Sequence, residues 1–312
     1  MRKNLIGEIS NTHKITKLDL IEKDIIIHEI MSDLSKDDFF HKNFLFKGGT
    51  CLVKSFLGYF RFSEDMDFTW KDQTIFQSLS VGKLRSTLSQ LIDQTGKIVE
   101  TIAKNRDFDF KCEKSNDNYV ELGGSNKICT FKIWYDSEIL NKKTFLKIQI
   151  NFVEKILFSA NNGKLSSLAT KNNDNLRILF GEKTEYLNEI DFDTYNPKEI
   201  LCEKIRAILT RQGTKARDFL DAYLICKNFK IKLSDIEKQS VEKLNFSLKM
   251  YEKYQINFKT KIKIIESGEL FTWGEEKILL LNDMTGEEER NFFSFIKELG
   301  IFLKTVITKI EI

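Results

Sequence analysis

The chain has 312 residues, of which 41% are apolar and 30% charged, and its formal net charge is +3. This length allows one large domain or two ordinary ones with a sizeable core, and the composition excludes an intrinsically disordered chain. The small net charge excludes a protein that is strongly basic overall, although the 49 Lys and Arg residues leave material for local basic patches on the surface.

The first part of the chain mixes helical and strand patterns. Amphipathic spacing predicts helices over residues 16–34 and 76–104, with a short helix over 50–57. Strands are predicted at 44–47 and 66–70, and alternation of apolar and polar residues predicts two half-buried strands at 127–135 and 145–153, joined as a hairpin.

After about residue 185 the pattern becomes helical. Asn196, Pro197 and Glu199 occupy the N-cap, N1 and N3 positions of a well-formed helix start. Helices are predicted over 197–212, 215–228, 233–256 and 285–310. We therefore expect an α+β protein with a core domain at 1–190, built on a mixed sheet with flanking helices, and a helical C-terminal domain at 191–312.

The cysteines and the apolar segments predict the compartment. The five cysteines are odd in number and scattered, with no Cys-x-x-Cys pair, so neither a zinc site nor a disulfide framework is expected. No apolar run follows the N-terminal basic residues, and no stretch approaches the roughly 18 apolar residues that span a bilayer. We expect a cytoplasmic protein with free thiols, without a signal peptide and without a membrane partner.

A possible phosphate site follows the first predicted strand, at Lys47-Gly48-Gly49-Thr50. Glycine has no Cβ, so the backbone there can approach a ligand closely. The N–H groups and the dipole of the helix that follows favour an anion such as a triphosphate, with the Thr50 hydroxyl as an extra donor. Taken alone, Gly-Gly before a helix is more often a tight turn than a binding site.

Two carboxylates lie on the next predicted strand. Side chains alternate along a strand, so Asp65 and Asp67 share one face while Met66 and Phe68 share the other. Two carboxylates on one face repel each other unless a cation lies between them, and their hard oxygen ligands suit Mg²⁺ in a phosphoryl-transfer centre. A lone Asp-x-Asp is common on solvated strand ends, but the apolar neighbours indicate that this strand is half buried.

Together the two motifs resemble a known family. A Gly-Gly-Thr followed about fifteen residues later by Asp-x-Asp on the next strand is the layout of the polymerase-β-like nucleotidyltransferase fold. The fuller pattern resembles the AbiEii/AbiGii toxin family of bacterial nucleotidyltransferases, which includes the toxins of type IV toxin–antitoxin systems. It reads Phe46-Lys47-Gly48-Gly49-Thr50-x-Leu52-x-Lys54, then Arg61-Phe62-Ser63-x-Asp65-x-Asp67-Phe68.

The resemblance continues in the C-terminal half, where family members carry a helical Lys, then an Arg, then Arg-Asp-x-x-Asp. The corresponding residues here are Lys204, Arg211, Arg217, Asp218 and Asp221. Helical spacing places Lys204 and Arg211 on one face and brings Asp218 near Asp221. Such pairs also stabilise many helices without any role in function.

The resemblance implies roles for these residues. Asp65, Asp67, Lys204 and Asp218 are the catalytic candidates, and Asp65 and Asp67 are also the candidate ligands of Mg²⁺, in a site for one or two metal ions. The candidates for nucleotide and phosphate binding are Lys47, Gly48, Gly49, Thr50, Lys54, Arg61, Ser63, Arg211, Arg217 and Asp221. Lys47, Lys54, Arg61, Lys204, Arg211, Lys215 and Arg217 could also form a basic funnel for RNA.

The sequence departs from the fold's pattern at one position. The fold usually supplies a third carboxylate on a later strand, but here the polar face of that strand offers Gln149 and Asn151. An amide is a poorer Mg²⁺ ligand than a carboxylate and cannot act as a base. Glu154, just beyond, is a candidate substitute.

The resemblance implies transfer of a nucleotide from an NTP to an acceptor, with the 3′ end of tRNA as the expected acceptor and a cognate antitoxin as a partner. Three alternatives stay open: transfer to a small molecule, transfer to a protein hydroxyl, and a catalytically impaired protein that only binds nucleotide. A ribonuclease is disfavoured, because the three histidines lie upstream of the motifs and none is paired in a nuclease-like spacing.

Overall fold

The computed structural model describes residues 2–170, 174–181, 185–268, 270–274, 279–281 and 284–311. The chain divides into two compact units. Unit 1 comprises Met1–Glu154 and Ala160–Thr194, and unit 2 comprises Lys155–Ser159 and Tyr195–Ile312. The boundary expected after residue 190 thus falls at the start of the last strand of unit 1. The segment Lys155–Ser159 also belongs to unit 2, although it lies earlier in the chain.

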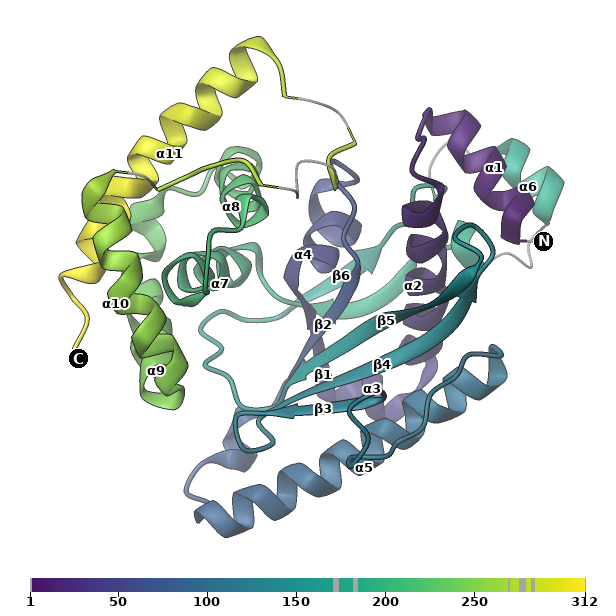
Figure 1. The fold of residues 1–312 in the computed structure, drawn as a ribbon, viewed down its shortest axis with the longest axis horizontal. Helices are drawn as coiled ribbons and strands as arrows, with labels where there is room; N and C mark the ends of the chain where they lie inside the picture. Colours follow the sequence, from purple (N-terminus) through teal and green to yellow (C-terminus); the bar gives the residue numbers. More distant parts are fainter. Residues whose placement is uncertain are drawn as a thin grey trace. The chain divides into compact units, whose positions relative to one another are not determined.

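A seven-stranded mixed sheet forms the centre of unit 1, in the order β3-β4-β5-β2-β1-β7-β6 (Figure 1). Its strands are β1 (Phe44–Lys47), β2 (Asp65–Trp70), β3 (Val120–Gly123), β4 (Ile128–Ser137), β5 (Lys142–Asn151), β6 (Asn161–Leu165) and β7 (Ile190–Thr194). β2 is antiparallel to β1 and parallel to β5, so the strand with the two aspartates lies between the other two.

The helices of unit 1 are α1 (Arg2–His13), α2 (Leu18–Lys36), α3 (Asp38–Asn43), α4 (Gly48–Cys51), α5 (Val81–Asn105) and α6 (Asp174–Phe180). α4 continues directly into a π-helix, η1 (Leu52–Leu57), and two 3₁₀ turns lie at η2 (Gln73–Phe76) and η3 (Glu185–Leu187). π-helical turns are rare and often lie at functional sites.

One face of the sheet carries the apolar core of unit 1. Phe46 and Phe68 are register partners, and both are buried together with Met66 and Ile148. Phe40 from α3 stacks on Phe44 and meets Phe68 edge to face, and α5 contacts β4 (Figure 1). Because side chains alternate along each strand, the polar residues that lie next to these in the sequence project from the opposite face of the sheet.

The elements that the structure describes in unit 2 are helices. They are α7 (Pro197–Thr210), α8 (Ala216–Phe229), the 3₁₀ turn η4 (Leu233–Ile236), α9 (Glu237–Met250), α10 (Glu252–Ser267) and α11 (Gly286–Ile307). α7 contacts α8, α9 and α10, and α11 packs on α8, α9 and α10 (Figure 1).

The predicted α+β fold is confirmed, and the strands and most helices lie close to their expected residues. Asn196 caps α7 by accepting a hydrogen bond from the backbone N–H of Lys198, with Pro197 in the first turn. The segment expected as one helix at 233–256 is instead η4, α9 and the start of α10. α1, α3, α6, β3, β6 and β7 were not predicted.

Two further sequence-based expectations can be compared with the structure. All five cysteines are free thiols, as expected, and Cys51, Cys129 and Cys202 are buried. Among the described helices, none is long and apolar enough to cross a membrane.

Candidate active site

Asp65 and Asp67 project from the sheet face opposite the apolar core, and both are half buried. Between them Met66 turns to the core and is fully buried, which fixes the register of the pair, because a slip by one residue would bury both carboxylates. The neighbouring strands place Lys47 opposite Asp67 on one side, and Lys147 and Gln149 beside Asp65 and Asp67 on the other.

Gly48 lies against one of these carboxylates. Its φ of +78° is in the left-handed region that favours glycine, and a Cβ at this position would lie 2.3 Å from Oδ2 of Asp67. Both the backbone conformation and the close approach therefore require glycine. Gly48, at the start of α4, and Asp67, on β2, are therefore packed directly against each other.

Gly49 is equally confined, because a Cβ there would lie 2.4 Å from the guanidinium of Arg61 and 3.1 Å from Oγ of Ser63. The Arg61 side chain is buried and donates a hydrogen bond to the carbonyl of Phe62 at 2.8 Å. The Thr50 hydroxyl lies 2.8 Å from Oγ of Ser63 and donates to the carbonyl of Asp65. The side chain that was expected to be an extra phosphate donor thus joins the helix start to β2.

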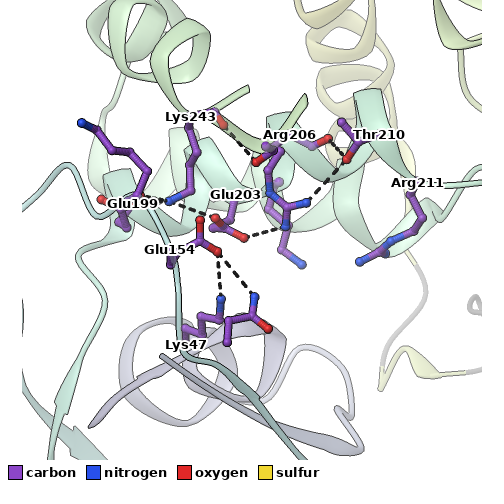
Figure 2. A network of polar contacts seen from close by, with 12 residues as sticks. Lys47, Glu154, Glu199, Glu203, Arg206, Thr210, Arg211 and Lys243 are labelled. Atoms are coloured by element: carbon purple, nitrogen blue, oxygen red, sulfur yellow. Dashed lines mark hydrogen bonds and ion pairs between the residues drawn. The ribbon is translucent and has the colours of Figure 1, made fainter. Parts of the chain in front are cut away.

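Lys47 and Glu154 form an ion pair at 3.5 Å in which both side chains are almost fully buried (Figure 2). Glu154 lies three residues beyond the end of β5 and also accepts a hydrogen bond from the amide of Asn151 at 3.4 Å. It is therefore engaged beside Lys47, and the position next to Asp67 on β5 is held by Gln149. No group of three or more acidic, His or Cys side chains suited to a metal ion occurs among the described residues.

The structure does not support the expected phosphate contact of Lys54. Its ammonium is fully buried, 2.8 Å from a carboxylate oxygen of Asp24 and 2.6 Å from the hydroxyl of Tyr59. Burial lowers the pKa of Lys54, and Asp24 opposes that shift. Tyr59 and Tyr186 each donate a hydrogen bond to Asp24, at 2.8 and 2.7 Å. This cation anchors the π-helix to α2 and is not exposed to a ligand.

In unit 2 the two catalytic candidates Lys204 and Asp218 lie in contact, at 3.0 Å. Lys204 also lies 2.6 Å from a carboxylate oxygen of Asp221, and Arg211 lies 2.6 Å from the second oxygen of Asp218. Burial would raise the pKa of Asp218, but Lys204 and Arg211 outweigh it, so this pKa is lowered. Two cations thus balance two buried carboxylates between α7 and α8.

The remaining cations of this region lie around the α7–α8 connection. Arg211 has a side chain that is 39% exposed, so its guanidinium reaches solvent while it pairs with Asp218. Arg217 is half buried and Lys215 is exposed. Lys261 from α10 donates to the carbonyl of Gly213 at 2.6 Å and holds the connection in place.

A second buried network in unit 2 was not predicted (Figure 2). Glu199 does not close a capping box; it accepts hydrogen bonds from the backbone N–H groups of Leu157 and Phe158, at 2.8 Å each, and pairs with the fully buried Lys243. Lys243 also lies 2.9 Å from Glu203 and donates to the carbonyl of Lys155. This network fixes the segment Lys155–Ser159 to the helices of unit 2.

Lys147 was not among the residues predicted for the site, although the register of β5 places it directly beside Asp65. The signal was present, because Lys147, Gln149 and Asn151 alternate with buried residues along one strand. What the sequence lacked was the parallel pairing of β5 with β2, since these strands are separated by more than seventy residues of chain.

Comparison with known proteins identifies the family. Residues 29–299 match the sequence model of a protein family described as the nucleotidyl transferase AbiEii toxin of type IV toxin–antitoxin systems. The chain belongs to this family. It is therefore a nucleotidyltransferase, and its family consists of the toxins of toxin–antitoxin systems. The motifs at Gly48–Thr50, Asp65–Asp67 and Lys204–Asp221 all lie inside the matched region.

Two solved structures from Helicobacter pylori are similar to this chain. JHP933 is 14% identical, with a TM-score of 0.40, over 93% of this chain and 92% of its own. A candidate nucleotidyltransferase is also 14% identical, with a TM-score of 0.42, over 95% of this chain and 97% of its own. No curated protein sequence matches the chain.

Proposed function

We propose that this nucleotidyltransferase transfers a nucleotide from an NTP to the 3′ end of tRNA in a Mg²⁺-dependent reaction, as a toxin in the bacterial cytoplasm. The observation that carries the proposal is the pairing of two half-buried carboxylates on one strand face with a glycine-built helix start in contact with one of them. Neither feature would be specific by itself.

The residues fit a magnesium ion. Asp65 and Asp67 offer hard oxygen ligands on one face, and Mg²⁺ is commonly held by one or two carboxylates with substrate phosphates and water completing its shell. When bound, the ion would neutralise charge on the phosphates and favour departure of pyrophosphate. The amide of Gln149 beside Asp67 points to a site that relies on these two carboxylates.

The helix start provides the proposed phosphate site. Gly48 and Gly49 let Asp67 and Arg61 approach the backbone closely, and the first N–H groups of α4 have no carbonyl partner within the helix. These donors suit the β- and γ-phosphates. Arg61, buried against Gly49, contributes positive charge beneath the same loop, while Lys47 and Ser63 border it.

We assign catalysis mainly to positioning and charge neutralisation. The oxygen of the acceptor hydroxyl attacks the α-phosphorus in line while its proton passes to water, and the bond from the α-phosphorus to the bridging oxygen breaks as pyrophosphate leaves. Lys204 and Asp218 remain candidate catalytic residues. Since Lys204 is already paired with two buried carboxylates, the half-exposed Arg211 and Arg217 are better placed to bind phosphate.

The family also implies a cognate antitoxin as partner, which we propose restrains this activity in the cell. Expression of the chain alone should then arrest growth. Growth should recover when Asp65 and Asp67 are both replaced by asparagine, because that change removes the proposed metal ligands and leaves the shape of the strand unchanged.

The direct test incubates the purified protein with total tRNA, Mg²⁺ and each of the four labelled NTPs in turn, beside an Asp65→Asn/Asp67→Asn control. Label entering tRNA only with the unmodified protein supports the proposal and names the nucleotide. Absence of label with every NTP rejects tRNA as the acceptor. A parallel titration of NTP binding then distinguishes an enzyme with another acceptor, such as a small molecule or a protein hydroxyl, from a chain that binds nucleotide without transferring it.

A further inference from the structure

The open face of the hairpin β4–β5 carries a cluster of aromatic and basic side chains beside the aspartate pair. Trp134 and Phe145 are register partners, and their ring centroids lie 4.7 Å apart. Lys132 and Lys147 are also register partners, two residues away along each strand and on the same face, and both ammonium groups lie within 6 Å of the Phe145 ring, at 5.9 and 5.7 Å. We call these four residues the aromatic–basic platform.

We propose that this platform binds the 3′-terminal nucleotides of a single-stranded RNA acceptor, with a base stacked on Phe145 and Trp134 and a backbone phosphate on Lys147. The inference rests on the proposed function and names the surface that holds its acceptor. Sequence-tolerant binding of single strands generally combines a basic groove with aromatic rings on which bases stack.

Position in the sheet selects the acceptor strand over the NTP as the ligand. The Gly48–Gly49 helix start follows β1, on one side of β2, whereas the platform lies on β5 and β4, on the other side. In-line displacement requires the attacking and leaving oxygens on opposite sides of the phosphorus. With pyrophosphate departing over β1 and α4, the attacking hydroxyl must approach from the side of β5.

The distances suit this assignment. Lys147 is the direct register partner of Asp65, so their Cα atoms are about 4.8 Å apart, the usual spacing between strands. Phe145 lies two residues further along β5 on the same face, roughly 7 Å from Lys147. The platform is therefore within reach of the last few nucleotides of a strand whose terminal hydroxyl lies over the aspartates.

The charges on the platform are difficult to explain by stability of the hairpin alone. Like charges directly opposite each other on paired strands are destabilising, yet Lys132 faces Lys147. Lys132, whose side chain is 15% exposed, pairs with Glu121 at 2.5 Å and donates to the carbonyl of Asp117 at 2.9 Å, so its charge is used within the fold. Lys147 forms no ion pair with any residue that the structure describes, and its ammonium group lies over the Phe145 ring. An unpaired cation on a half-buried aromatic surface suits an incoming phosphate.

The experiment measures binding of a fluorescent single-stranded RNA of about twelve nucleotides, a length within the usual site size, to the full chain by anisotropy. The RNA ends in a 3′-deoxynucleotide, so no transfer can occur. Phe145→Leu keeps apolar bulk but removes stacking, Phe145→Tyr keeps the ring, and Lys147→Gln removes the unpaired charge. Lys142→Gln is the matched control, because Lys142 is an exposed lysine of the same strand whose side chain points to the other face.

Phe145→Leu should weaken RNA binding roughly 5- to 150-fold, the range for loss of one stacked base, while Phe145→Tyr and Lys142→Gln bind normally. Lys147→Gln should reduce the slope of log affinity against log salt by about 0.7, as expected for one phosphate contact to a single strand. A residue that only stabilised the hairpin would leave this slope unchanged. NTP affinity should be unaffected in every variant.

Two results would overturn the platform: unchanged RNA affinity and salt slope in folded Phe145→Leu and Lys147→Gln, or a loss of NTP affinity with RNA binding intact. The second would place the nucleotide base on the platform. The proposed function is tested separately, by measuring whether the unmodified protein transfers labelled nucleotide to RNA. If that protein labels RNA but the variants bind normally, only the platform is rejected; if the variants lose RNA affinity but no label is ever transferred, only the proposed function is rejected.

Discussion

Replacement of Gly48 by alanine separates backbone strain from displacement of a carboxylate. Gly48 has a φ of +78°, and an added Cβ would lie 2.3 Å from Oδ2 of Asp67 and 3.0 Å from its Cβ and Cγ. Contact between such atoms normally begins at about 3.5 Å. The carboxylate must therefore move by about 1 Å, or the start of α4 must move instead.

The two effects differ in magnitude. A residue with a Cβ at positive φ costs about 1–2 kcal/mol, which a folded chain of this size tolerates. Misplacement of a reacting group by about 1 Å costs on the order of 100-fold in rate. We therefore expect Gly48→Ala to remain folded and to lose at least 100-fold in nucleotide transfer.

Gly268→Ala is the control, since Gly268 has a φ of +82° with no atom near the position of an added Cβ. Both variants should show similar losses in melting temperature, measured by differential scanning fluorimetry. Only Gly48→Ala should lose transfer, measured with labelled NTP at a temperature where both are folded. Full activity of Gly48→Ala, or an equal loss in Gly268→Ala, would refute the assignment of Asp67 to the reacting centre.

Three further predictions follow from the buried and half-buried polar groups. Lys204→Met leaves Asp218 and Asp221 without their shared cation and should destabilise the chain by about 3–5 kcal/mol, whereas Lys204→Arg should retain most of the stability in denaturant unfolding. Burial lowers the pKa of His28 to about 3, below its unfolded value of about 6.5, so the fold favours the neutral imidazole. The contribution of His28 to the free energy of unfolding is therefore complete above pH 6.5 and is lost as the pH falls towards 3. His28→Gln should flatten the dependence of the unfolding free energy on pH in that window. Gln149→Glu places a third carboxylate beside Asp67 and should lower the Mg²⁺ concentration for half-maximal transfer by about tenfold, equivalent to about 1.4 kcal/mol; an unchanged Mg²⁺ dependence would show that Gln149 does not face the metal.

The parts of the site that could be predicted are those set by local sequence. Gly48 and Gly49 signal a tight turn before a helix, and alternation along a strand places Asp65 and Asp67 on one face without knowledge of any partner strand. The resemblance to the family supplied Lys204 and Asp218 as candidate residues, but their direct contact comes from the structure. Each of these predictions depends only on residues that lie within one turn, one strand or two adjacent elements of the sequence.

The remaining features depend on pairings distant in sequence, which residue type alone does not reveal. Lys54 has the spacing of a phosphate-binding lysine, but Asp24, on a helix thirty residues earlier, lies 2.8 Å from it in the core. Thr50 has the position of a phosphate donor, but its hydroxyl is taken by the carbonyl of Asp65. In both cases a polar group beside a binding loop satisfies the fold instead, because a buried polar atom without a partner is costly.

Burial therefore distinguishes cations that are paired inside the fold from cations that are available to a substrate, a distinction that the sequence alone does not make. Lys54 is paired with Asp24, and Lys204 is paired with Asp218 and Asp221, so moving either lysine onto a substrate phosphate would leave buried negative charge unpaired. Arg211 is partly exposed, and Lys147 has no recorded ion pair within the described chain, so both can take a phosphate at much lower cost. A substrate should thus be bound mainly by the cations that the fold does not need, and one of them, Lys147, which the sequence motifs did not include, is the direct register partner of Asp65.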